Sequence, residues 1–162
     1  MSRTFSSWLS GPESAEPNPV DDAPGHALGL PASGPGSLAP MGRRLAALAL
    51  DWFTALGLAG LGVTFGLVRL EEYLLGGDWQ TAASVIWLVL GIAAVRLFGF
   101  TPGQYACGLR VIPVDSADTG VGIVRAVGRM LLIALVVPAL FTDANGRGLQ
   151  DRATATAVVR SR

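Results

Sequence analysis

The stretch LAALALDWFTALGLAGLGVTFGL, residues 45–67, is 23 residues long and contains one charged side chain, Asp51. At about 1.5 Å per residue, a helix of this length exceeds the roughly 30 Å thickness of the bilayer's hydrocarbon core. A second apolar stretch, residues 82–100, also contains a single charge, Arg96. Both stretches, with a few flanking residues, are therefore predicted to be transmembrane helices.

The composition agrees with a membrane protein. Hydrophobic residues make up 51% of the 162 residues and charged residues only 15%, against about a quarter charged in a typical soluble domain. The formal net charge is zero, so nothing supports nucleic-acid binding. The single cysteine, Cys107, excludes an intrachain disulfide and a cysteine-based metal cluster. All basic residues are arginines in an Ala/Gly/Val-rich chain, which indicates a bacterial source.

The first forty residues differ from the rest of the chain. Residues 1–40 contain seven Pro, five Gly and seven Ser, with few large apolar side chains. Such a segment buries too little surface to offset its ordering entropy. We therefore predict a disordered tail over residues 1–40 and one membrane domain over residues 41–162.

A third apolar segment is shorter. Only thirteen residues, interrupted by Pro138, separate Arg129 from Asp143, and as a helix they cover about 20 Å. A helix over about residues 121–141 is long enough to span, but it draws Arg125 and Arg129 toward the membrane. Short apolar runs of this kind are typical of re-entrant segments. Both a re-entrant and a spanning helix remain open.

Two segments rich in β-branched residues help to decide between a re-entrant and a spanning third helix. Residues 109–114 and 154–160 are predicted to be short strands, and isolated strands of this length need a partner. If they pair with each other, both lie on one face of the membrane. This favours the re-entrant helix. The expected fold is thus an α-helical membrane protein with two transmembrane helices, a third short apolar helix and a small cytoplasmic β-pair. The two transmembrane helices are expected to cover about residues 42–69 and 79–100.

Arginine placement predicts the orientation. Arg43 and Arg44 precede the first helix, several arginines follow the second, and the intervening loop is net acidic. Because arginine-rich loops stay in the cytoplasm, we expect a multi-pass protein of the bacterial plasma membrane with a cytoplasmic N-terminus. Residues 68–79 are then outside.

Asp51 is expected about 10 Å inside the cytoplasmic boundary. A central aspartate costs about 2.5–3.5 kcal/mol and a shallower one costs less, but Asp51 still requires a partner. Arg44 lies two turns earlier on the same helical face. Arg96 and Arg129 lie at similar depth on the other two apolar segments. We therefore predict an intramembrane charge cluster of Arg44, Asp51, Arg96 and Arg129, acting either as a structural clasp between helices or as a polar site for an ion.

These segments resemble the RDD family of small bacterial membrane proteins, which is named for an arginine and two aspartates. GRRLAALALD resembles the family's opening element through Arg44 and Asp51, with Arg43 as an alternative arginine. FGFTPGQYACGLRVIPVD resembles the element after the second helix, although Gln104 replaces the usual lysine. Its matching positions are Gly99, Thr101, Gly103, Gly108, Arg110 and Val111.

The closing element of the family is also present. The segment from Arg129 to Val159 resembles an arginine, an apolar stretch and a D-R pair before a T-x-V-V end. Ala155 lies near a position where the family often has glycine. The matching positions are Arg129, Asp151, Arg152, Thr156, Val158 and Val159. The resemblance implies a membrane protein and, in function, the transport of ions or small solutes that is commonly suggested for the family.

No nucleophile, metal or phosphate-binding motif is present in the sequence, so we expect no enzymatic activity, no cofactor and no metal site. The residues favour a scaffold or accessory subunit of a membrane complex, with the lipid bilayer and a membrane-protein partner or a second copy as its contacts. The alternative is an oligomeric transporter of ions or small solutes that uses the Asp51–arginine cluster.

Overall fold

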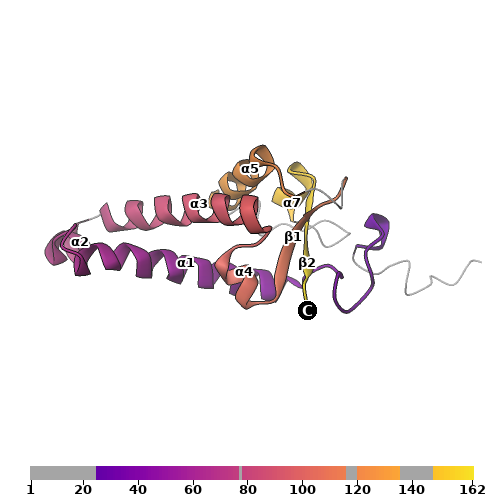
Figure 1. Cartoon of the computed structure of the whole chain (residues 1–162), viewed down its shortest axis with the longest axis horizontal. Coiled ribbons are helices and arrows are strands. Elements are labelled where there is room, and N and C mark those ends of the chain that lie inside the picture. Colours follow the sequence, from indigo (N-terminus) through magenta and orange to yellow (C-terminus); the bar gives the residue numbers. More distant parts are fainter. Residues whose placement is uncertain (1–24, 77, 116–119, 136–147) are drawn as a thin grey trace, which may run out of the picture.

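The computed structural model describes residues 25–76, 78–115, 120–135 and 148–162. Two long helices, α1 (Met41–Thr64) and α3 (Asp78–Phe98), lie side by side as an antiparallel hairpin (Figure 1). The short helix α2 (Leu70–Leu75) is at one tip of the hairpin. The remaining elements gather at the opposite end, hereafter the sheet end: α4 (Pro102–Ala106), β1 (Leu109–Pro113), α5 (Ile123–Ala134), α7 (Leu149–Ala153) and β2 (Thr156–Arg160).

The long helices have the properties of membrane spans. Both α1 and residues 79–98 of α3 are long and apolar enough to cross a bilayer, with only 22% and 28% of their most apolar windows buried inside the protein. Phe53 of α1 is 68% exposed and Val89 of α3 is 60% exposed. Helices at the core of a soluble protein would be mostly buried, so this outward apolar surface indicates a membrane protein.

Aromatic side chains gather at both ends of the hairpin. Tyr73 packs against Trp79 near α2, with ring centroids 6.0 Å apart. At the sheet end, Phe100 lies 5.9 Å from Phe98 and 5.2 Å from Tyr105, again between ring centroids. Such belts are typical of the two membrane–water interfaces.

The buried face of α1 consists mostly of small residues. Ala47, Asp51, Ala55 and Ala59 are the buried residues of α1, and their spacing of four places them on one face. Residues without bulky side chains permit close helix packing in membranes. The predicted helix over residues 42–69 ends earlier, at Thr64, because the chain turns through Gly66, whose φ is +70°.

The predicted strand pair is confirmed. β1 and β2 are antiparallel, with Val111 opposite Val158. Residues 36–39 run along the other edge of β2: Ala39 N–H donates to the Val158 carbonyl at 2.9 Å, and Leu38 bridges Val159. The predicted disordered tail is therefore too long at its C-terminal end, because main-chain hydrogen bonds and the burial of Ala39 offset the ordering cost there. Residues 1–24 lie outside the described residues.

The third apolar segment is described only in part. α5 has 12 residues, about 18 Å of helix, and packs on α3. The rest of the predicted helix over residues 121–141 includes residues 136–141, which lie outside the described residues. At the sheet end, a hydrophobic core joins α1, α3, α5 and both strands through Ala47, Val95, Leu109, Val111, Val121, Ala126 and Val158.

Candidate functional site: a capped aspartate and a buried ion triad

Asp51 lies on the buried face of α1, 8% exposed. Its carboxylate accepts a hydrogen bond of 2.5 Å from the Thr101 hydroxyl and one of 2.7 Å from the Gly103 backbone N–H. Both donors belong to the first turn of α4, where the N–H groups have no partner within the helix. Asp51 therefore fastens α1 to α4 and provides an acceptor for that turn.

Residues 101–104, TPGQ, determine the local geometry. Thr101 and Gln104 form a capping box: the Thr101 hydroxyl accepts from Gln104 N–H at 3.2 Å, and the Gln104 side-chain oxygen accepts from Thr101 N–H at 3.0 Å. Gly103 is required for the close approach, because a Cβ there would overlap the Ala47 carbonyl oxygen and lie 3.0 Å from the Asp51 carboxyl carbon.

The predicted pairing of Asp51 with arginines is wrong. Among the residues that the structure describes, Asp51 has no ion pair, and its two partners are neutral groups. The physical reason is that α4 folds back against α1 and supplies two donors at the carboxylate itself, whereas Arg44 and Arg129 reach a different carboxylate.

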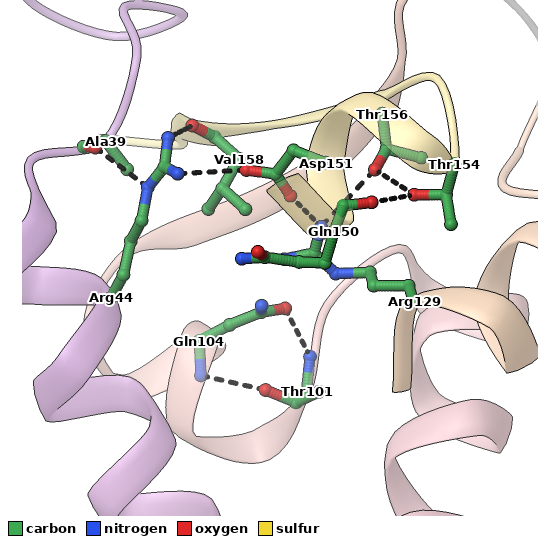
Figure 2. Close-up of polar contacts among 10 residues, drawn as sticks. All are labelled: Ala39, Arg44, Thr101, Gln104, Arg129, Gln150, Asp151, Thr154, Thr156 and Val158. Carbon is green, nitrogen blue, oxygen red and sulfur yellow. Dashed lines mark hydrogen bonds and ion pairs between the residues drawn. The ribbon is translucent and has the colours of Figure 1, made fainter. Parts of the chain in front are cut away.

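That second carboxylate belongs to Asp151 on α7, which is completely buried. Arg44 of α1 pairs with one of its oxygens at 2.9 Å, and Arg129 of α5 pairs with the other (Figure 2). This Arg44–Asp151–Arg129 ion triad, hereafter the triad, connects three helices at the sheet end. Two guanidinium groups on one carboxylate satisfy both of its oxygens, which a buried charge requires.

Further hydrogen bonds hold the triad in place. Arg44 also donates to the Ala39 carbonyl at 2.9 Å and lies 3.4 Å from the Val158 carbonyl, so it connects α1 to the segment before it and to β2. Arg129 lies 3.3 Å from the Thr156 hydroxyl, which is itself 3.0 Å from the Thr154 hydroxyl. The guanidiniums are thus oriented by β2 and its neighbours as well as by Asp151.

The other predicted site residues lie apart from the triad. Arg96, Arg110 and Arg152 are exposed, on α3, β1 and α7. Gly108 is buried with a φ of +66°, and a Cβ there would lie 3.0 Å from Arg162.

At the surface, Arg125 makes a bidentate ion pair with Asp115, with hydrogen bonds of 2.6 and 2.5 Å. These hydrogen bonds raise the pKa of Arg125 above its ordinary value.

A small cavity lies between Asp51 and the triad, and both apolar and polar side chains line it. It has a volume of about 50 Å³ and is lined by groups from α1, α3, α4, α5, α7 and β2. Its polar lining consists of Arg44, Asp51, Thr101, Gln104, Arg129 and Gln150. Within the described part of the chain, no group of three or more His, Cys, Asp or Glu residues could hold a metal ion.

The RDD family model matches residues 38–154. This range begins at the bridge to β2 and includes Arg44, Asp51 and Asp151. The chain belongs to the RDD family. RDD proteins are small membrane proteins, in agreement with the two spans of this one. No curated protein and no solved structure matches the chain.

Several residues of this RDD protein's site were missed by the sequence reasoning. Gln104 was noted only as a departure from the family's lysine, yet it closes the capping box. The spacing T-x-x-Q was a signal that could have identified it. Gln150 and Thr154 lie in a short polar helix and turn with no apolar periodicity, so no sequence pattern indicated their burial.

Proposed function

We propose that this RDD protein is a non-enzymatic, multi-pass protein of the bacterial plasma membrane that acts as a scaffold or accessory subunit of a membrane complex. The observation that carries the proposal is a groove of about 860 Å³ between α1, α3 and α5. Its lining is mostly apolar, but Gln80, Thr81 and Ser84 of α3 also line it. Polar side chains within a bilayer are stabilised by hydrogen bonds to a neighbouring helix, so the groove suits a transmembrane helix of a partner protein.

The arrangement of buried charge supports the same proposal. Arg44 and Arg129 are both engaged with Asp151, and Asp51 is held by Thr101 and Gly103. These contacts fasten α1, α4, α5 and α7 to one another. Such a clasp stabilises a rigid platform, which an accessory subunit needs.

The proposed orientation places the sheet end in the cytoplasm. Apart from Arg69, the arginines of the described residues lie at that end, whereas α2 at the opposite tip contributes Glu71 and Glu72. This asymmetry follows the positive-inside rule. Because β1 and β2 are paired, the chain between them leaves and returns at one face, which supports a re-entrant α5 segment and a cytoplasmic C-terminus.

Capture from native membranes tests the accessory role. Tagged protein, cross-linked and solubilised in mild detergent, is expected to co-purify with a membrane protein at near-stoichiometric yield by quantitative mass spectrometry. Val85→Trp, inside the groove, should reduce that yield. Val89→Trp, on an exposed part of α3 outside the groove, is the matched control and should not. Purification of the protein only with itself would contradict the accessory role.

An oligomeric transporter of ions or small solutes is the second candidate. It is favoured by the buried Asp51 carboxyl group on the wall of a cavity inside the membrane domain, since intramembrane ionisable groups often mark transport pathways. Two or three apolar segments leave little room for a pathway within one copy. Flux in proteoliposomes that Asp51→Asn abolishes would establish this function, and absence of flux in the wild-type protein would remove it.

A further inference from the structure

The lining of the cavity between Asp51 and the triad is largely apolar, but it includes two buried polar groups whose hydrogen bonding is incomplete. Arg129 is 2% exposed and Gln150 is 6% exposed. Among the described residues, the Arg129 Nε and the Gln150 Oε1 have no hydrogen-bond partner. Both residues line the cavity. Buried polar atoms in native proteins almost always have a partner, from the protein or from ordered water.

From this geometry we infer that the cavity is a binding site for a small cluster of ordered water molecules, which joins the capped Asp51 to the triad. A water molecule can accept from the Arg129 Nε–H and donate to the Gln150 Oε1, so it satisfies both groups at once. The volume of about 50 Å³ has room for on the order of two to four waters. The Gln104 amide nitrogen supplies a further donor on the opposite wall, near Thr101 (Figure 2).

Charge balance favours water over an ion. Among the described residues, the guanidiniums of Arg44 and Arg129 and the carboxyl groups of Asp51 and Asp151 bring groups of both signs to this region. A bound anion would face the two carboxyl groups and a bound cation would face the two guanidiniums, which is costly in a buried site. Water adds no charge and supplies both donors and acceptors.

The hydration is one-sided. Toward α2, the cavity is bounded by a buried apolar cluster of Ala55, Trp87 and Met130, and apolar surroundings of this kind stay dry. Toward the sheet end, Met41 and Leu45 of the first turns of α1 line the cavity and are partly exposed. The proposed waters therefore lie on the sheet-end side of Trp87.

Water-edited solid-state NMR on the full-length, isotope-labelled protein in lipid bilayers tests this inference. Magnetisation from water is expected to reach the Arg129 Nε–H several-fold faster than the Ala55 backbone N–H. Equal, slow transfer to both groups would show a dry cavity and overturn the inference. A shift of the Arg129 Nε resonance that titrates with sodium bromide would show an anion site instead, and would overturn it equally.

Variants sharpen the test. Gln150→Leu removes one of the two unsatisfied groups and should slow the transfer to Arg129 several-fold. Leu149→Gln makes the converse change at a neighbouring exposed position of α7 and should leave the transfer unchanged. Unchanged transfer in a folded Gln150→Leu protein would contradict the bridging role of Gln150. Because the wild-type measurement needs no variant, the inference can be tested even if Gln150→Leu does not fold.

Discussion

Arg44 and Asp151 are 107 residues apart in the sequence, yet their side chains form an ion pair of 2.9 Å in which Asp151 is fully buried. The pair connects the start of the first membrane helix to the last helix of the chain. Arg129 approaches the other oxygen of the same carboxylate. Asp151 therefore joins α1, α5 and α7 at the sheet end.

Replacing Asp151 by asparagine should be strongly destabilising. The change keeps the shape of the side chain but removes the negative charge that faces the two guanidiniums, and breaking a buried ion pair from one side costs about 3–5 kcal/mol. Unfolding by denaturant in detergent micelles, followed by circular dichroism, measures the free energy. The control is Asp115→Asn, which removes the carboxylate of an exposed pair with Arg125 and should barely change stability. Equal effects of the two variants would contradict the structural role of the triad.

Thr101→Val tests how Asp51 is held. The substitution removes the hydroxyl that donates to Asp51 and accepts from Gln104 N–H, so it leaves buried polar groups unsatisfied at a cost of about 1–3 kcal/mol. Thr54→Val is the matched control, because the Thr54 hydroxyl bonds only to the Leu50 carbonyl within α1. If arginine rather than Thr101 stabilised Asp51, the two variants would unfold at the same denaturant concentration.

Gly103→Ala should separate α1 from α4. A methyl group at this position meets the backbone carbonyl of Ala47, which cannot move without shifting the helix. We expect a loss near the upper end of the roughly 1–3 kcal/mol that overpacking costs. Gly57→Ala provides the comparison, because no atom lies within 4 Å of a Cβ at that position of α1. Thermal unfolding in nanodiscs measures both, and a stable Gly103→Ala protein would show that the close approach is not required.

The membrane hairpin and the strand pair could be predicted because their signals are local. An apolar run longer than the bilayer is thick specifies a spanning helix wherever its partners lie. The strands at Leu109–Pro113 and Thr156–Arg160 were likewise recognisable from β-branched composition, and each had only one candidate partner.

The contacts of the charged residues could not be derived in the same way. Depth along a helix placed Asp51 level with several arginines, but depth does not say which carboxylate an arginine reaches. That choice depends on how α4 packs against α1 at Gly103 and how α7 packs against α5 and β2. Both α4 and α7 are short helices of five residues, and their polar sequences give no periodic signal. Asp151 was recognised only through the resemblance to the RDD family, not as the centre of the triad.

Ala155 offers a stabilising substitution. It is the one residue other than glycine with a positive φ, +48°, among those that the structure describes, and it follows the C-terminus of α7. Glycine is the usual residue at such a left-handed helix end. For alanine the left-handed conformation costs roughly 1–2 kcal/mol, part of which is offset because glycine makes the unfolded chain more flexible. Ala155→Gly should therefore stabilise the protein by about 0.5–1 kcal/mol and raise its thermal midpoint in nanodiscs by a few degrees. Ala153→Gly, inside α7, should have the opposite sign, because glycine within a helix is destabilising. A lower midpoint for Ala155→Gly would mean that the turn between α7 and β2 is not strained.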